Sequence, residues 1–91
     1  MSAPAPWSVV YSDMGRLALA TATPEERAAV LAFEKELARD PYTLGEIYPD
    51  RVGGIYTALL TVGGRRGWTS VLYRVDEAAR EVLVIALVSG P

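Results

Sequence analysis

Four arginines and a tryptophan in the second half of the chain are the residues whose types and spacing can contribute to chemistry. Arg65 and Arg66 stand in a glycine-rich segment, Trp68 follows, Arg74 comes shortly after, and Arg51 lies in the preceding loop. Guanidinium groups bind phosphates and an aromatic ring stacks on a base, as in proteins that bind single-stranded RNA. All five residues are therefore candidates for nucleic-acid binding. The alternative, which the sequence alone favours, is a solvated hairpin tip whose arginines keep it soluble.

Tyr73 is a candidate catalytic residue, because its phenol can donate a proton to a leaving oxygen. It stands among alternating apolar residues, however, and this pattern favours a core tyrosine. Glu46 is a potential base in a long loop, but nothing in the sequence positions it. The chain has no histidine and no cysteine, which excludes serine–histidine and cysteine–histidine hydrolases. The Gly-x-x-x-x-Gly-Lys-Ser/Thr phosphate-binding pattern is also absent, so we expect no cofactor and no metal.

Length and composition indicate one globular domain. The chain has 91 residues, of which 51% are hydrophobic and 22% charged. We expect a flexible lead-in over residues 1–6, with no signal peptide, and a single domain over residues 7–91. Nine Lys and Arg against eleven Asp and Glu give a net charge of −2, so nucleic-acid binding requires a local basic patch. The longest apolar run, Val82–Val88, is too short for a membrane-spanning helix.

The elements that must position these side chains begin with a strand and a short helix. Residues alternate over Trp7–Ser12 as in a half-buried strand. Asp13 is expected to cap the helix that follows, in which Met14, Leu17 and Ala18 share one face.

A second helix has a strong start signal at Thr23-Pro24-Glu25-Glu26. The threonine is the cap, the proline takes the first helical position, and the second glutamate completes a capping box. The helix should run to about Arg39, because the residue before Pro41 avoids helical angles. Its expected apolar stripe consists of Ala29, Val30, Phe33 and Leu37.

The remainder of the chain predicts a three-strand meander after a loop over residues 42–54. The expected strands are Ile55–Val62, Trp68–Asp76 and Glu81–Val88, joined by turns over residues 63–67 and 77–80. The last strand is apolar on both faces, which indicates an interior strand with the first strand beside it. We therefore predict an α+β fold, a small sheet with two helices packed on one face.

The second face of this sheet is expected to be too apolar for water. If Val71, Tyr73 and Val75 face the core, then Trp68 and Leu72 lie on the other side beside one apolar row of the last strand. Trp68 and Leu72 are therefore predicted partner-binding residues. The lead-in, a second copy in a homodimer, or a dedicated partner protein would each cover this face, and the sequence does not choose among them.

Three stretches in this order resemble the RelE/ParE superfamily of toxins from type II toxin–antitoxin systems. They are Trp7–Ser12, similar to the family's opening strand, Leu37–Pro41, similar to its helix-ending Leu-x-x-Asp-Pro, and Val71–Asp76, similar to its third-strand signature. The resemblance implies a cytoplasmic toxin held by a cognate antitoxin. Members are commonly ribosome-dependent endoribonucleases that cleave messenger RNA (mRNA interferases), or gyrase inhibitors in the ParE branch.

The nuclease signature of that family is incomplete in this chain. Ser70 stands where the nucleases usually have arginine, and Leu87–Pro91 supplies neither the basic or histidine residue nor the aromatic of their C-terminal strand. The catalytic candidates that remain are Arg65, Arg66 and Tyr73. Our leading hypothesis is a toxin that inhibits translation by ribosome-dependent mRNA cleavage or binding. The alternatives are a non-catalytic interaction module with the same fold and a ParE-like gyrase inhibitor.

Overall fold

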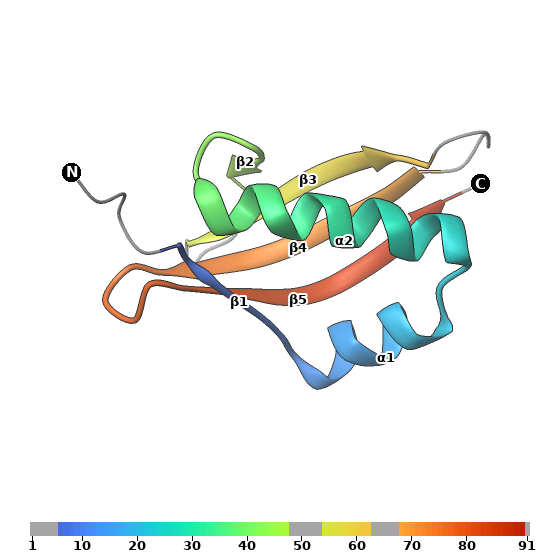
Figure 1. Ribbon diagram of the computed structural model, residues 1–91, viewed down its shortest axis with the longest axis horizontal. Coiled ribbons are helices and arrows are strands. Elements are labelled where there is room, and N and C mark those ends of the chain that lie inside the picture. The colour runs from blue at the N-terminus through green and yellow to red at the C-terminus, as the bar shows by residue number, and fades with distance from the viewer. Residues whose placement is uncertain (1–5, 48–53, 63–67, 91) are drawn as a thin grey trace.

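The computed structural model describes residues 6–47, 54–62 and 68–90, and only the backbone at positions 68, 89 and 90. Figure 1 shows two helices against one sheet. In chain order the elements are β1 (Ser8–Tyr11), α1 (Asp13–Thr21), α2 (Pro24–Arg39), β2 (Glu46–Ile47), β3 (Ile55–Thr61), β4 (Trp68–Asp76) and β5 (Glu81–Gly90). The predicted turn over residues 63–67 lies outside the described residues, as do Arg51, Arg65 and Arg66.

The sheet has the predicted topology. Its strand order is β1-β5-β4-β3-β2, with β1 parallel to β5 and every other neighbouring pair antiparallel. The last strand is therefore interior, and the α+β fold class is confirmed. A parallel neighbour for β5 requires a crossover, which α1 and α2 supply between β1 and the meander (Figure 1).

Helix α2 forms as its sequence signals predict. The Thr23 hydroxyl accepts from the Glu26 N–H at 3.2 Å, and the Glu26 carboxylate accepts from the Thr23 N–H at 2.9 Å, which completes the capping box. The helix ends at Arg39. Its buried side chains are Val30, Phe33 and Leu37, the predicted stripe without Ala29, which is half-buried.

Helix α1 departs from the prediction in its cap and its buried side. Ser12 is the cap, with its hydroxyl accepting from the Gly15 N–H at 3.0 Å and donating to the Ile85 carbonyl at 2.7 Å. Gly15 is buried, whereas Met14 and Leu17 are 68% and 66% exposed. The physical reason is a close approach to β5, since a Cβ at Gly15 would lie 2.8 Å from the Val84 carbonyl oxygen. The helix therefore faces the sheet through its glycine.

A β-bulge in β5 interrupts the simple alternation of its side chains between the two faces of the sheet. Leu72 pairs with Ala86 but Tyr73 pairs with Val84, so one extra residue lies in β5 at this point. Simple alternation puts Leu83 and Leu87 on one face, whereas the bulge separates them. Val82, Val84 and Leu87 belong to the core, and Leu83, Ala86 and Val88 point to the other side.

The core lies between α2 and one face of the sheet. Its buried members are Trp7, Phe33, Leu37, Ala58, Val71, Tyr73, Val82 and Val84. The Arg80 guanidinium lies over the Trp7 ring at 4.6 Å, which closes the end of the core near β1.

The sequence prediction missed one strand, since β2 lies within the predicted loop over residues 42–54. No helix in the described part of the chain is long and apolar enough to span a membrane.

Candidate functional site

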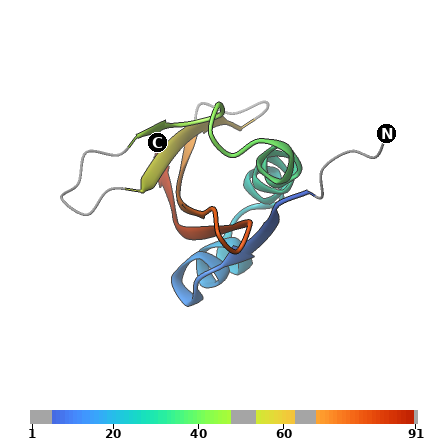
Figure 2. The ribbon, with the colours of Figure 1, turned by 90° about the vertical axis from the view of Figure 1, so that its left-hand side faces the viewer.

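The face of the sheet opposite α2, called here the open face, is the candidate functional site. Strand pairing arranges its side chains in rows across β3, β4 and β5. The rows are Ile55–Arg74–Leu83, Thr57–Leu72–Ala86 and Leu59–Ser70–Val88. Figure 2 shows α2 on the other side of the sheet, while α1 lies beside β5. The strand pattern therefore places Leu72 and Arg74 on one surface, and for Leu72 this is the predicted side of the sheet.

The open face is mainly apolar. Leu59 is 65% exposed and Val88 51% exposed, while Leu72, Leu83 and Ala86 are half-buried. A contiguous apolar surface of this kind marks an interaction site, because isolated monomers seldom leave one in water. Leu59 was not predicted as part of it. The alternation within Ile55–Thr61, together with the pairing to β4, is the signal that identifies Leu59.

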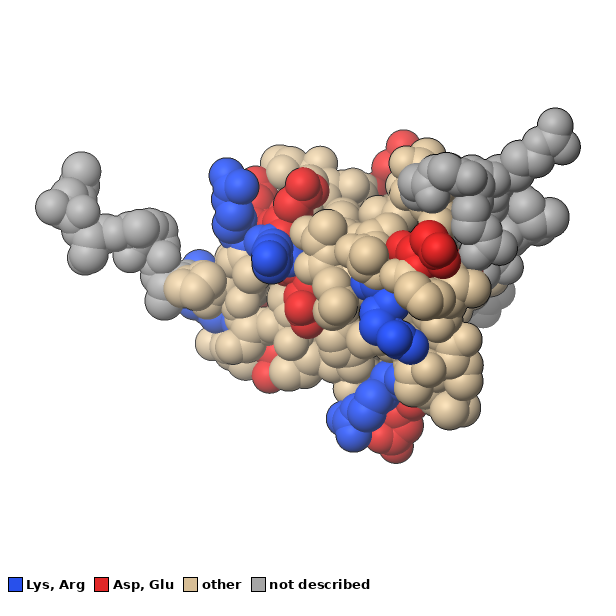
Figure 3. Space-filling view, turned by 45° about the vertical axis from the view of Figure 1, so that its right-hand side comes forward, with Lys and Arg blue, Asp and Glu red and all other residues tan. Residues whose placement is uncertain are grey.

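Arg74 supplies positive charge to this surface. It is exposed, and its neighbours across the strands are Ile55 and Leu83. Asp76 and Glu81 pair with each other one row further along and add negative charge at that end. Arg74 is thus a single cation on an apolar surface rather than part of a described basic stripe. On the side that carries α2, seen in Figure 3, basic and acidic side chains are interspersed.

The structure brings only part of the predicted basic cluster into view. Arg51, Arg65 and Arg66 lie outside the described residues, and their candidacy remains a prediction. For Trp68 the backbone is described, and it pairs with Thr61 and Gly90 at the beginning of β4. Arg74 is the one member of the predicted nucleic-acid set whose side chain can be placed.

Tyr73 lies within the core. Its side chain has no exposed surface, its hydroxyl donates to the Pro41 carbonyl at 2.9 Å, and its ring stacks on Tyr56 at 5.6 Å. Burial raises the Tyr73 pKa to about 12, and the charges of Tyr56 and Asp40 add to this effect. The phenol is therefore neutral at physiological pH and holds the segment after α2 against the sheet. This arrangement agrees with the core role that its sequence pattern favours.

The described residues of the open face offer binding rather than proton transfer. Its rows contain one ionisable side chain, the guanidinium of Arg74, which donates hydrogen bonds but does not act as a base. Within the described ranges no group of three or more His, Cys, Asp or Glu is placed to hold a metal ion. Glu46 is exposed on β2, at the sheet edge rather than on these rows. What this part of the face can do is contact an apolar partner and neutralise one phosphate.

Comparison with solved structures identifies the fold. The chain is similar to a chain of the RelBE2 toxin–antitoxin complex from Mycobacterium tuberculosis, with a TM-score of 0.76 and 26% identity over 97% of this chain and 95% of that one. The chain has the RelE-like fold of the RelE/ParE superfamily. The recognition made from Trp7–Ser12, Leu37–Pro41 and Val71–Asp76 is thereby confirmed.

Two further structures show the same RelE-like fold. A mutant of the Escherichia coli toxin RelE in the free state matches with a TM-score of 0.73 and 12% identity, over 90% of this chain and 81% of that one. The archaeal RelE–RelB complex from Pyrococcus horikoshii matches with a TM-score of 0.65 and 15% identity, over 90% and 92%. No protein-family model matches the RelE-like chain, and no curated protein matches it by sequence.

Proposed function

We propose that this RelE-like chain is the toxin of a toxin–antitoxin pair and that it inhibits translation in the cytoplasm. The observation that carries the proposal is the match to the RelBE2 complex, which extends over 97% of this chain and 95% of its counterpart. A match of that extent leaves little of either chain outside the shared fold.

The apolar open face supports the presence of an antitoxin. Leu59 and Val88 are largely exposed beside the half-buried Leu72, and burying such surface is worth about 25 cal/mol per Å². A bound antitoxin would remove this surface from water and block access to the same face. Neutralisation then follows from competition for one surface.

Binding to the ribosome and mRNA is the proposed mode of action. Arg74 is the described side chain suited to a phosphate, and Arg51, Arg65, Arg66 and Trp68 are the further candidates that the sequence offers. The described rows hold no acid or base that could transfer a proton. RNA binding at the open face is therefore the least activity that we propose, and cleavage requires groups outside these rows. The non-catalytic alternative draws its support from this same observation.

Expression of the chain with and without its genomic neighbour tests the proposal. Alone it should arrest growth and halt translation, and the product of the adjacent gene should restore both. Primer extension on mRNA from arrested cells separates cleavage from binding, since binding alone leaves the transcripts intact. Normal growth with continuing translation at high expression would count against a toxin, and DNA breaks that precede the translational arrest would indicate gyrase as the target.

The variant Arg74→Ala tests the open face directly. We expect roughly tenfold weaker inhibition of translation in vitro, because one charge-assisted phosphate contact is removed. Arg39→Ala is the matched control, since Arg39 is equally an exposed arginine but lies on α2, on the other side of the sheet. Equal activity of both variants and the wild type would remove Arg74 from the RNA site.

A further inference from the structure

The hydroxyl of Ser12 makes a contact that depends on the bulge in β5. Ser12 follows the last residue of β1, and its N–H donates to the Val84 carbonyl at 2.9 Å while its hydroxyl donates to the Ile85 carbonyl at 2.7 Å. Successive carbonyls of a regular strand point to opposite edges, so one of these two would face β4 rather than Ser12. The bulge inserts one residue at this point, and both carbonyls face Ser12. The bond from the Ser12 hydroxyl therefore requires the bulged strand.

Helix α1 begins directly on the same two carbonyls. The Ser12 hydroxyl also accepts from the Gly15 N–H at 3.0 Å, as the cap of the helix. A Cβ at Gly15 would lie 2.8 Å from the Val84 oxygen and 3.6 Å from the Ile85 oxygen, so the first turn of α1 lies against the bulge. One serine thus joins the end of β1, the start of α1 and the extra residue of β5.

The side-chain pattern of β5 does not by itself require this bulge. The register of a strand is specified strongly where one face is apolar and the other polar, whereas residues 82–88 are apolar on both faces. Without the bulge, the residue opposite Leu72 would be Ile85 instead of Ala86. Specific contacts must therefore distinguish the two arrangements of β5, and the bond from the Ser12 hydroxyl is a contact that only the bulged arrangement makes.

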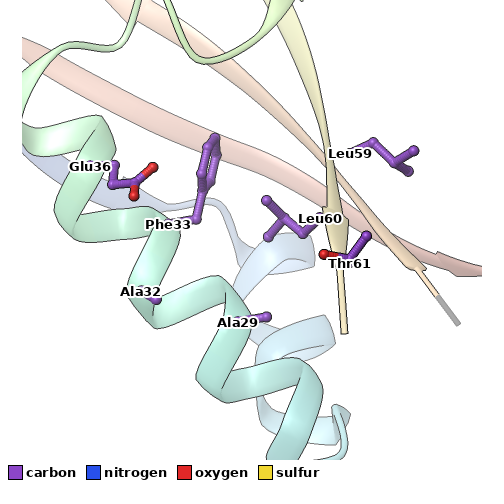
Figure 4. Close-up of a pocket in the computed structure, with 7 residues that line it drawn as sticks. All are labelled: Ala29, Ala32, Phe33, Glu36, Leu59, Leu60 and Thr61. Carbon is purple, nitrogen blue, oxygen red and sulfur yellow. The ribbon is translucent and has the colours of Figure 1, made fainter. Parts of the chain in front are cut away.

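The bulge decides which side chains of β5 lie on the open face. The rows of that face are aligned with β3, and Figure 4 shows Leu59 of β3 pointing away from α2. With the bulge, β5 contributes Ala86 and Val88 to these rows. Without it, regular alternation after Tyr73 would put the bulkier Ile85 and Leu87 in their places. The shape of the open face is therefore set at the bulge.

We propose that Ser12 is a positioning residue that stabilises the bulge at Ile85 and thereby fixes which side chains β5 presents on the open face. It acts through the backbone of β5, from a place outside the rows of that face. That the open face binds a ligand rests on the proposed function, whereas stabilisation of the bulge by Ser12 does not. One net hydrogen bond of this kind changes the ratio of two arrangements roughly fivefold.

Three substitutions at Ser12 separate the bond to the bulge from the helix cap. Ser12→Asp retains the cap, because aspartate is as good a cap as serine, but its carboxylate cannot donate to the Ile85 carbonyl. Ser12→Ala removes both interactions, and Ser12→Thr retains both. If Ser12 is only a cap, aspartate should behave like the wild type. If it stabilises the bulge, aspartate should alter β5 as alanine does, and threonine should preserve the wild-type pairing.

Nuclear magnetic resonance on the full chain measures the pairing of β5. The wild type should give cross-strand contacts between Leu72 and Ala86. In Ser12→Asp we expect the ratio of regular to bulged strand to rise roughly fivefold, seen as contacts between Leu72 and Ile85 or, at low population, as relaxation dispersion at residues 85–88. Thr23→Asp, the same acid at the cap of α2, is the control and should leave β5 unchanged. Wild-type behaviour of β5 in Ser12→Asp would overturn the proposal, as would an equal change in Ser12→Thr.

Deletion of Ile85 keeps the proposal testable even where Ser12→Asp alone prevents folding. Without Ile85, regular alternation after Val84 places Ala86 and Val88 on the open face, so that no bulge is needed. In that background Ser12→Asp should leave folding and the pairing of β5 unchanged. The same effect of Ser12→Asp with and without Ile85 would show that the serine acts independently of the bulge, and the proposal would be wrong.

Translation inhibition by Ser12→Asp separates this inference from the proposed function. If the open face is the site, inhibition should weaken in proportion to the lost population of the bulged strand. Unchanged inhibition with altered pairing of β5 would retain the inference and remove the open face from the proposed function. Weakened inhibition with wild-type pairing would overturn the inference and leave the proposed function in place.

Discussion

The hydrogen bond from the Tyr73 hydroxyl to the Pro41 carbonyl allows a quantitative test of the core. Tyr73→Phe removes that bond, 2.9 Å long, from a side chain with no exposed surface and leaves the ring in place. A buried hydrogen bond contributes about 1 kcal/mol net, and an acceptor left without its donor adds to the loss. We therefore expect the free energy of unfolding to fall by about 1–2 kcal/mol at neutral pH.

Alkaline pH should reverse this difference. The pKa of Tyr73 is raised from 10.0 to about 12, a difference of about two pH units, and each unit corresponds to about 1.4 kcal/mol. Because the Tyr73 phenol of the unfolded chain ionises first, the stabilisation of the fold by the neutral phenol is complete below about pH 10 and is lost as the pH rises toward 12. The wild type should thus lose up to about 3 kcal/mol over this interval through Tyr73, and Tyr73→Phe should not.

Urea denaturation followed by circular dichroism at about pH 8 and about pH 11.5 measures both effects. The stability advantage of the wild type should shrink to zero or change sign at the higher pH. Tyr42→Phe is the comparison, because Tyr42 is 40% exposed and its substitution should cost less stability at about pH 8 than Tyr73→Phe. If Tyr73→Phe leaves stability unchanged at both pH values but abolishes translation inhibition, the tyrosine acts in catalysis and our assignment to the core is wrong.

Three further substitutions test local features of the fold. Gly15→Ala should destabilise the protein by about 1–3 kcal/mol in thermal unfolding, because the added Cβ would lie 2.8 Å from the Val84 carbonyl oxygen. Met14→Ala, on the exposed side of α1, is the control. Equal destabilisation by the two substitutions would argue against the close approach of Gly15 to β5. Thr23→Ala should lower stability by about 1 kcal/mol through loss of the capping box, whereas an unchanged melting temperature would show that the cap is dispensable. Hydrogen bonds from the Tyr42 N–H and the Thr43 hydroxyl lower the Asp40 pKa. The ionised carboxylate therefore stabilises the fold above the ordinary aspartate pKa, and this stabilisation is lost as the pH falls below it. In acid titration Asp40→Asn should lack this pH-dependent loss of stability, and identical acid profiles of variant and wild type would contradict it.

The elements of this fold were predictable because their signals are local. Thr23, Pro24 and Glu26 satisfy the first turn of α2 through neighbours in sequence, and Asp40-Pro41 ends it for a similarly local reason. The apolar run in β5 indicates an interior strand, because strands that are apolar on both faces are typical of the middle of a sheet. From these features the α+β class and the position of β1 beside β5 follow without coordinates.

Features that depend on contacts between distant residues were not available from such patterns. Neither the bulge in β5 nor the burial of Gly15 has a local signal, since each exists only where α1, β4 and β5 meet. The exposure of Leu59 depends in the same way on where β2 ends. Propensity acts over a few residues, while register and exposure are set by packing of the whole sheet. For this reason residue types revealed what kind of protein this is, and only the folded arrangement revealed which surfaces it presents to a partner.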